Sequence, residues 1–336
     1  PAAAPTPPVS SATTATAPLP DPKTPQEFFA RARALSDLEA SGIPFHLKAT
    51  YVASGDAEFT GNGTYEEWWQ SKDLWRKEAT LGDYRYVAIR SGGKNSVAAT
   101  TSYIPLRVRQ VMGLQVFHIA MPEQENGVWG LSRMTGVSGV KEVATLKRSC
   151  GGGDDSSCAK QYDFAGVGVL QSYRVNDLAE TYTGFQPFGN EFFPMKVTVT
   201  LRGDALLIVH IVSLEKLSGA EHGPMDTNTP ADLPSVPSRL FEYPPAKDVT
   251  PPKPVHVVRV KYPKSERKSH PNRLVIVACT IDATGAVREP YVQLSGGTPF
   301  DQAAMDAVRK CHFSPAAKNG IPGMADLSIA ISFRIY

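Results

Sequence analysis

Four cysteines are the residues of this sequence whose type and spacing suggest chemistry most directly. Cys150 and Cys158 flank the polar segment Gly-Gly-Gly-Asp-Asp-Ser-Ser. A disulfide between them would stabilise the fold by about 2.5 kcal/mol in the chain-entropy model, and it would persist in an oxidising compartment. A zinc site is disfavoured, because zinc-binding cysteines usually lie roughly two to four residues apart with a second ligand pair nearby. The spacing therefore predicts a disulfide in an exported protein.

The motifs of the common enzyme classes are missing from the sequence. Its seven histidines include no pair at the i, i+4 spacing of a helical metal site. The segment Gly136-Val137-Ser138-Gly139 lacks the final glycine of a nucleophile elbow, and the sequence contains neither a phosphate-binding loop nor a dinucleotide-binding glycine triplet. We therefore expect no catalytic residue, no metal site and no cofactor.

Composition limits the partners further. The 336 residues are enough for more than one domain, and 35 basic residues nearly balance 33 acidic ones. This balance gives no reason to expect nucleic acid as a partner. No apolar run approaches the roughly 18 residues of a membrane-spanning helix. The chain begins with Pro1 in a Pro/Ala/Thr-rich stretch, which is typical of a mature chain after removal of a targeting segment.

The first large domain is predicted over residues 24–220, after a disordered tail at residues 1–23. Thr24-Pro25-Gln26-Glu27 is typical of a helix start, with Thr24 as N-cap and Glu27 completing a capping box. Apolar and polar residues alternate from Phe45, and short strand patterns with turn signals follow as far as residue 214. These patterns predict a strongly curved antiparallel sheet, similar to a half-barrel, with the first helix in its concavity.

Residues 221–255 carry nine prolines and are predicted to form an extended connector between two domains. Beyond it, residues 256–336 show strand patterns at 273–281 and 287–294, a helix that starts at Thr298 as N-cap, and a last strand from Asp326 to Ile335. Pro290 indicates an edge or a bulge in the second strand, and Gly285 suits a left-handed turn position. The predicted fold class is α+β, with a small ββαβ module at the C-terminus.

The C-terminal module contains five short motifs: Tyr262-Pro263, Thr280-Ile281-Asp282-x-x-Gly285-x-Val287, Phe300-Asp301-x-Ala303-Ala304, Ala307-Val308-Arg309-Lys310 and Phe313-x-Pro315-Ala316. In this combination the module resembles the TonB C-terminal domain family. The sequence departs from the family at Cys311, where an aromatic residue is usual. Because Cys279 and Cys311 both occupy core-facing positions, a second disulfide and two buried free thiols are the alternatives.

The first domain contains Gly61-x-Gly63-Thr64-Tyr65, Trp68-Trp69 and Leu74-Trp75-Arg76. In these few residues it faintly resembles the half-barrels of LolA and LolB, which carry lipoprotein acyl chains. A curved sheet around a helix suits either a ligand cavity or a filled core, and we favour the filled core.

The TonB resemblance implies binding of envelope proteins in the periplasm or at the outer-membrane periphery, with a TonB-dependent outer-membrane receptor or a larger membrane complex as partner. We predict that an extended partner segment adds to the edge of the last strand. The predicted contact residues are Arg259, Tyr262, Pro263, Ser328, Ala330, Ser332 and Arg334. The alternatives are an edge covered by the first domain or by a second copy in a homodimer, a lipid or lipoprotein carrier, and an accessory subunit of an envelope complex.

Overall fold

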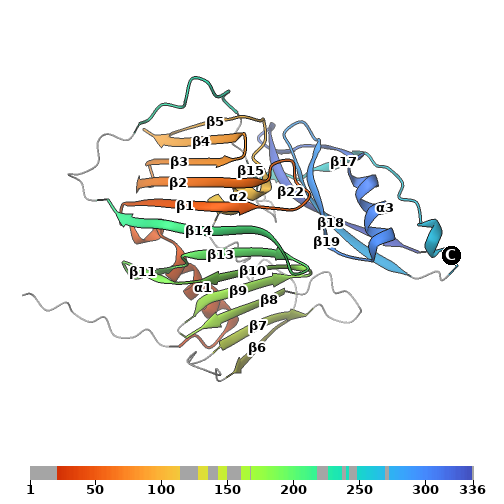
Figure 1. Cartoon of the computed structure of the whole chain (residues 1–336), viewed down its shortest axis with the longest axis horizontal. Coiled ribbons are helices and arrows are strands. Elements are labelled where there is room, and N and C mark those ends of the chain that lie inside the picture. The colour runs from red at the N-terminus through yellow and green to blue at the C-terminus, as the bar shows by residue number, and fades with distance from the viewer. Residues whose placement is uncertain are drawn as a thin grey trace, which may run out of the picture.

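The protein was analysed as a computed structural model. It describes residues 21–113, 128–134, 143–149, 160–166, 168–217, 226–236, 240–241, 248–268 and 272–334. These residues form mostly β-sheet, with a large curved antiparallel sheet, a smaller sheet region at the C-terminus and three α-helices (Figure 1). Within the described ranges, no helix is long and apolar enough to cross a membrane.

The first helix, α1 (Pro25–Ser36), begins as its sequence predicts. The Thr24 hydroxyl accepts a hydrogen bond from the Glu27 backbone N–H at 3.2 Å, and the Glu27 carboxylate accepts one from the Thr24 N–H at 3.2 Å. Pro25 occupies the first helical turn, where its missing N–H costs nothing. The capping box therefore fixes the point at which the chain enters the first domain.

The large sheet is antiparallel, and its first and last strands in the sequence pair with each other near its centre. Its strands are β1 (Phe45–Ala53), β2 (Gly61–Ser71), β3 (Leu74–Leu81), β4 (Tyr84–Ser91), β5 (Lys94–Ala99), β6 (Val128–Met134), β7 (Val143–Ser149), β8 (Lys160–Ala165), β9 (Val169–Val175), β10 (Leu178–Thr183), β13 (Lys196–Leu201) and β14 (Asp204–Lys216). They lie in the order β5-β4-β3-β2-β1-β14-β13-β10-β9-β8-β7-β6. A short hairpin of β11 (Gln186–Phe188) and β12 (Glu191–Phe193) follows β10.

Aromatic side chains fill the space between α1 and the sheet. Phe28 packs on Phe164 with ring centroids 5.2 Å apart, and Phe29 meets Tyr162 edge-on at 4.9 Å. All four rings are almost completely buried. A second helix, α2 (Leu106–Met112), carries Val108 and Val111 into the same core.

The C-terminal module packs against one end of the large sheet (Figure 1). Its elements are β18 (Arg273–Ile281), β19 (Val287–Leu294), α3 (Thr298–Val308), β20 (His312–Ser314), β21 (Ala316–Lys318) and β22 (Ile321–Phe333). The helix covers one face of the sheet. As Pro290 indicated, β19 lies at the edge of the sheet, and its register with β18 shifts nearby.

Two details of this module differ from the sequence prediction. The N-cap of α3 is Gly297 rather than Thr298, because the Asp301 carboxylate turns back to accept hydrogen bonds from Ser295 and Gly296 just before the helix. The last strand begins at Ile321 rather than Asp326, and the short strands β20 and β21 precede it. The predicted ββαβ order is therefore incomplete.

Three short strands from the Pro-rich segment join the C-terminal module. They are β15 (Leu240–Phe241), parallel to β22; β16 (Val249–Thr250), antiparallel to β21; and β17 (Lys253–His256), antiparallel to β20. Proline favours an extended backbone and is tolerated in edge strands, so a Pro-rich segment can form short pairings of this kind. The connector is thus partly tied to the module that follows it.

Candidate partner-binding site

The last strand is paired along one side over its whole second half and open on the other. β18 pairs with β22 from Ala325 to Phe333. On the opposite side, β21 pairs with residues 321–323 and β15 with residues 324–325. Within the described ranges, no strand pairs with that side of residues 327–333. We call residues 327–333 on this side the open edge.

Side chains along the open edge alternate as the sequence predicts. Leu327, Ile329 and Ile331 are partly buried against the α3 core, and Phe333 is 4% exposed. The exposed side chains on the other face are those of Asp326, Ser328, Ala330 and Ser332. The strand is therefore anchored by one face and presents small polar or apolar groups on the other.

The side to which each backbone N–H of the open edge points follows from the hairpin that precedes it. Asn319 and Gly320 have φ values of 52° and 74°, as in a two-residue type I′ turn. The closing pair of such a hairpin is hydrogen-bonded, so the Ile321 N–H points to β21. Successive N–H groups alternate in direction, and the pairing with β18 runs without a register shift.

The outward donors of the open edge are therefore the N–H groups of odd-numbered residues. Leu327, Ile329 and Ile331 direct their N–H groups to the open side, whereas Ala330 directs its N–H to β18. Ala316 lies opposite Gly323 and also packs with Ala325. This contact agrees with odd-numbered side chains sharing one face from the hairpin to the end of the strand.

The other predicted contact residues lie in different surroundings. Tyr262 packs edge-on against Phe300 at 5.4 Å and Phe333 at 6.2 Å, so its ring anchors the chain beside the end of β22. Pro263 is partly buried, and Arg259 and Arg334 are exposed. The structure thus brings Tyr262 to the end of the open edge, in a packing position.

A buried arginine that the sequence analysis did not single out holds the beginning of the open edge. Arg109 of α2 donates to the Asp326 carboxylate at 2.7 Å, to the Thr280 hydroxyl at 2.5 Å and to the Ile104 carbonyl at 3.0 Å. Its side chain is 6% exposed. The first domain therefore fixes β18 and β22 where the open edge starts. No local sequence pattern links residues 109 and 326.

The turn between β18 and β19 is held by Asp282. Its side chain accepts hydrogen bonds from Thr284 N at 2.8 Å, from Ala286 N at 3.1 Å and from Arg288 Nε at 2.8 Å. Gly285 adopts φ 87°, as predicted for a left-handed position, and a Cβ there would lie 1.8 Å from the Phe313 carbonyl oxygen. Burial opposes ionisation of Asp282, but these hydrogen bonds outweigh it and lower its pKa.

Asp282 should make the module sensitive to acid. Because its folded-state pKa lies below the unfolded value, its stabilisation is complete above the unfolded pKa and is lost as pH falls through the folded pKa. We expect Asp282→Asn to remove this part of the pH dependence below about pH 4. Urea unfolding midpoints at a series of pH values would test this, and parallel wild-type and variant profiles would contradict it.

Cys279 and Cys311 are free thiols rather than a disulfide, and of the two only Cys279 is fully buried. The Cys311 Sγ–H donates to the Ala307 carbonyl at 3.3 Å, which turns the thiol toward its own helix. Burial raises the pKa of Cys279 to about 12. The predicted bond between Cys150 and Cys158 lies outside the described residues and stays a prediction.

The two described thiols should differ in their rate of alkylation. At pH 8 the folded protein should react with iodoacetamide at Cys311, which is partly exposed, while Cys279 stays protected because its thiolate is scarce and buried. Peptide mass mapping measures both sites. Equal labelling of both cysteines in folded protein, or a bond between them under oxidising conditions, would contradict this assignment.

The fold defines a class of protein: a small α+β module joined to a large curved sheet. Residues 258–335 match the family described as Gram-negative bacterial TonB protein C-terminal. Protein TonB of Vibrio cholerae is 28% identical over 111 residues, which are 32% of this chain and 46% of that protein. The chain thus matches less than half of the curated relative's length.

Two solved structures resemble the chain in part. A LolA superfamily protein from Nitrosomonas europaea has a TM-score of 0.33 and 8% identity, covering 59% of this chain and 95% of the other. A putative outer membrane lipoprotein-sorting protein domain from Vibrio parahaemolyticus also has a TM-score of 0.33 and 8% identity, covering 57% and 92%.

Proposed function

We propose that this protein is a non-catalytic envelope protein whose TonB C-terminal domain captures an extended segment of a partner protein along the open edge. The observation that carries the proposal is the side of residues 327–333 with which no strand of the described structure pairs. An edge strand with free donors and acceptors can take up another strand, and the side chains beside it then select the sequence.

The chemistry of the surface agrees with such a partner. The side chains of Ser328, Ala330 and Ser332 are small and exposed, so an incoming backbone can approach the strand without displacing bulky groups. Arg334 follows the open edge and is exposed. We infer a partner in the periplasm or at its outer-membrane face, such as an outer-membrane receptor or a subunit of a membrane complex, in keeping with a role in transport.

The carrier alternative has less support from the geometry of the first domain. A lipid carrier needs an apolar cavity inside its curved sheet. In the described residues, Phe28, Phe29, Tyr162 and Phe164 occupy the space between α1 and the sheet and bury one another. We infer that this part of the interior is a filled core.

Photo-crosslinking in the native host tests the proposal. A benzoylphenylalanine at Ala330 should give adducts with envelope proteins, whereas the same residue at Val212, which is 63% exposed on β14, should not. Mass spectrometry identifies the adducts. An adduct of twice the chain mass would show that the edge pairs with a second copy instead, and equal adduct patterns from both positions would reject the open edge as the binding site.

A further inference from the structure

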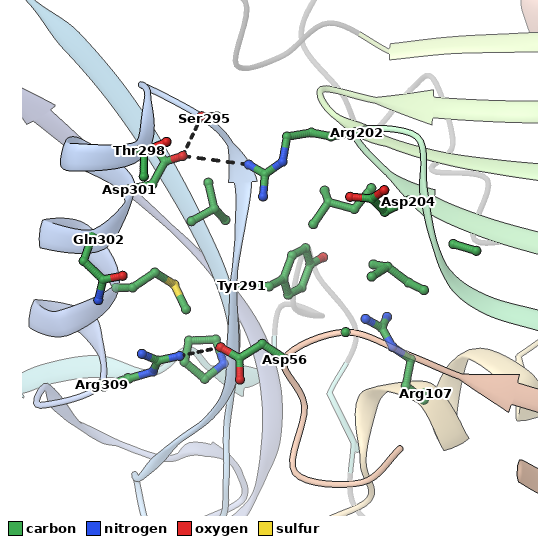
Figure 2. Close-up of a pocket in the computed structure, with 17 residues that line it drawn as sticks. Asp56, Arg107, Arg202, Asp204, Tyr291, Ser295, Thr298, Asp301, Gln302 and Arg309 are labelled. Atoms are coloured by element: carbon green, nitrogen blue, oxygen red, sulfur yellow. Dashed lines mark hydrogen bonds and ion pairs between the residues drawn. The ribbon is translucent and has the colours of Figure 1, made fainter. Parts of the chain in front are cut away.

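A cavity of about 680 Å³ lies between the first domain and the TonB C-terminal domain. The first domain contributes the loop after β1, the β13–β14 turn and one side chain of α2. The C-terminal domain contributes β19 and the exposed side of α3 (Figure 2). A volume of this size suits a small organic molecule. This cavity is separate from the open edge and from the interior of the curved sheet.

Arg107 is the unusual residue of the lining. It is 5% exposed, and Figure 2 shows its guanidinium pointing into the space beside Tyr291. Its Nη1 donates to the Gln110 side chain at 2.9 Å, while its Nε has no hydrogen-bond partner. Among the described residues, no carboxylate lies within ion-pair distance of it, although the Glu289 carboxylate attracts it from farther away.

Burying a cation without a counter-charge costs several kcal/mol, and native proteins usually avoid it by pairing. Arg109, two residues along the same helix, is equally buried and has its carboxylate in Asp326. The contrast between these neighbouring arginines indicates that Glu289 compensates the Arg107 charge only in part, and that the Arg107 Nε–H is free to bind a further group. An anion entering the cavity would supply such a group.

The other charged groups of the lining largely neutralise one another. Arg309 pairs with Asp56 at 2.8 Å, and Arg202 lies 3.9 Å from Asp301 (Figure 2). Asp204 is exposed on the β13–β14 turn. Arg107 is therefore the cation of the lining that is both buried and without an ion-pair partner.

Apolar groups occupy much of the remaining lining. Leu201, Leu206 and Met305 are each less than a tenth exposed, and Pro290 and Val292 of β19 also line the cavity. A free inorganic anion would leave this apolar surface uncovered. An anion with an apolar body would bury it and gain the hydrophobic contribution as well.

We propose that the junction cavity binds an organic anion with an apolar body, whose carboxylate or phosphate head accepts hydrogen bonds from Arg107. The planar guanidinium offers a fork of donors that matches either head group. Because both domains line the cavity, such a ligand would bridge them. The proposal is independent of strand addition at the open edge.

Calorimetric titration of the full chain tests the charge selectivity with simple probes. Octanoate and octyl phosphate should bind, and whichever binds more tightly identifies the head group. Octylamine and octanol have the same apolar body without the anion and should bind at least tenfold more weakly. Equal binding of octanoate and octylamine, or no binding of either anion at millimolar concentration, would overturn the proposal.

Two variants locate the site. Arg107→Gln should weaken octanoate binding at least tenfold, and Ala205→Trp should do the same by filling the cavity from an exposed position that leaves Arg107 in place. Arg85→Gln, which changes a half-exposed arginine paired with Asp232 elsewhere on the first domain, should bind as wild type.

Further controls show whether a variant folds and whether its open edge still binds a partner. Should Arg107→Gln fail to fold, Ala205→Trp alone decides, and unchanged octanoate binding by that variant would refute the site. Crosslinking from Ala330 should survive Ala205→Trp, because the cavity and the open edge are distinct. Loss of octanoate binding with intact crosslinking therefore reports on the cavity alone.

Discussion

Replacing Asp326 with alanine is expected to lower the free energy of unfolding by about 2 kcal/mol. The change leaves the Arg109 guanidinium buried at the domain junction with only Thr280 and a backbone carbonyl as partners. Breaking a fully buried pair costs about 3–5 kcal/mol, and an exposed pair about 0–1 kcal/mol. The Asp326 side chain is 49% exposed while that of Arg109 is 6% exposed, so an intermediate value follows.

Asp56→Ala provides the matched control. It removes the partner of Arg309 across the same two domains, but both side chains of that pair are exposed, at 86% and 44%. We expect a loss below about 1 kcal/mol. Urea unfolding followed by circular dichroism measures both variants. If the two lose the same stability, the Arg109 network does not hold the domains together.

Local sequence patterns predicted the elements of both domains well. The capping box at Thr24, the alternation from Phe45 and the left-handed turn at Gly285 depend on residues close together in the chain, and each is confirmed. The TonB resemblance was also confirmed, because its motifs lie within one module.

Two kinds of feature were missed. Asp301 reaches back to Ser295 and Gly296, so the helix begins after Gly297 rather than at a Thr298 cap. The pairing of Arg109 with Asp326 depends on residues far apart in the sequence and arises only where the two domains meet. The sequence around Arg109, an apolar stretch with two arginines, does not distinguish one arginine from the other.

The direction of the backbone N–H groups at the open edge decides which proline substitution tests strand addition. A proline at Ala330 would remove a donor to β18, because the hairpin geometry turns that N–H inward. The outward donors belong to the odd-numbered residues. Proline must therefore replace one of these to test strand addition, and the loss of its apolar side chain must be controlled.

Ile329→Pro is expected to reduce partner crosslinking from Ala330 at least tenfold, relative to Ile329→Ala. Both variants lose the same packing against the α3 core, but only proline removes the outward N–H and places a ring against the incoming strand. A lost hydrogen bond of about 1.4 kcal/mol alone corresponds to tenfold weaker binding. Adduct yields of the two variants, with circular dichroism to confirm folding, measure the difference. Similar yields from two folded variants would mean that the partner does not add as a strand to this edge.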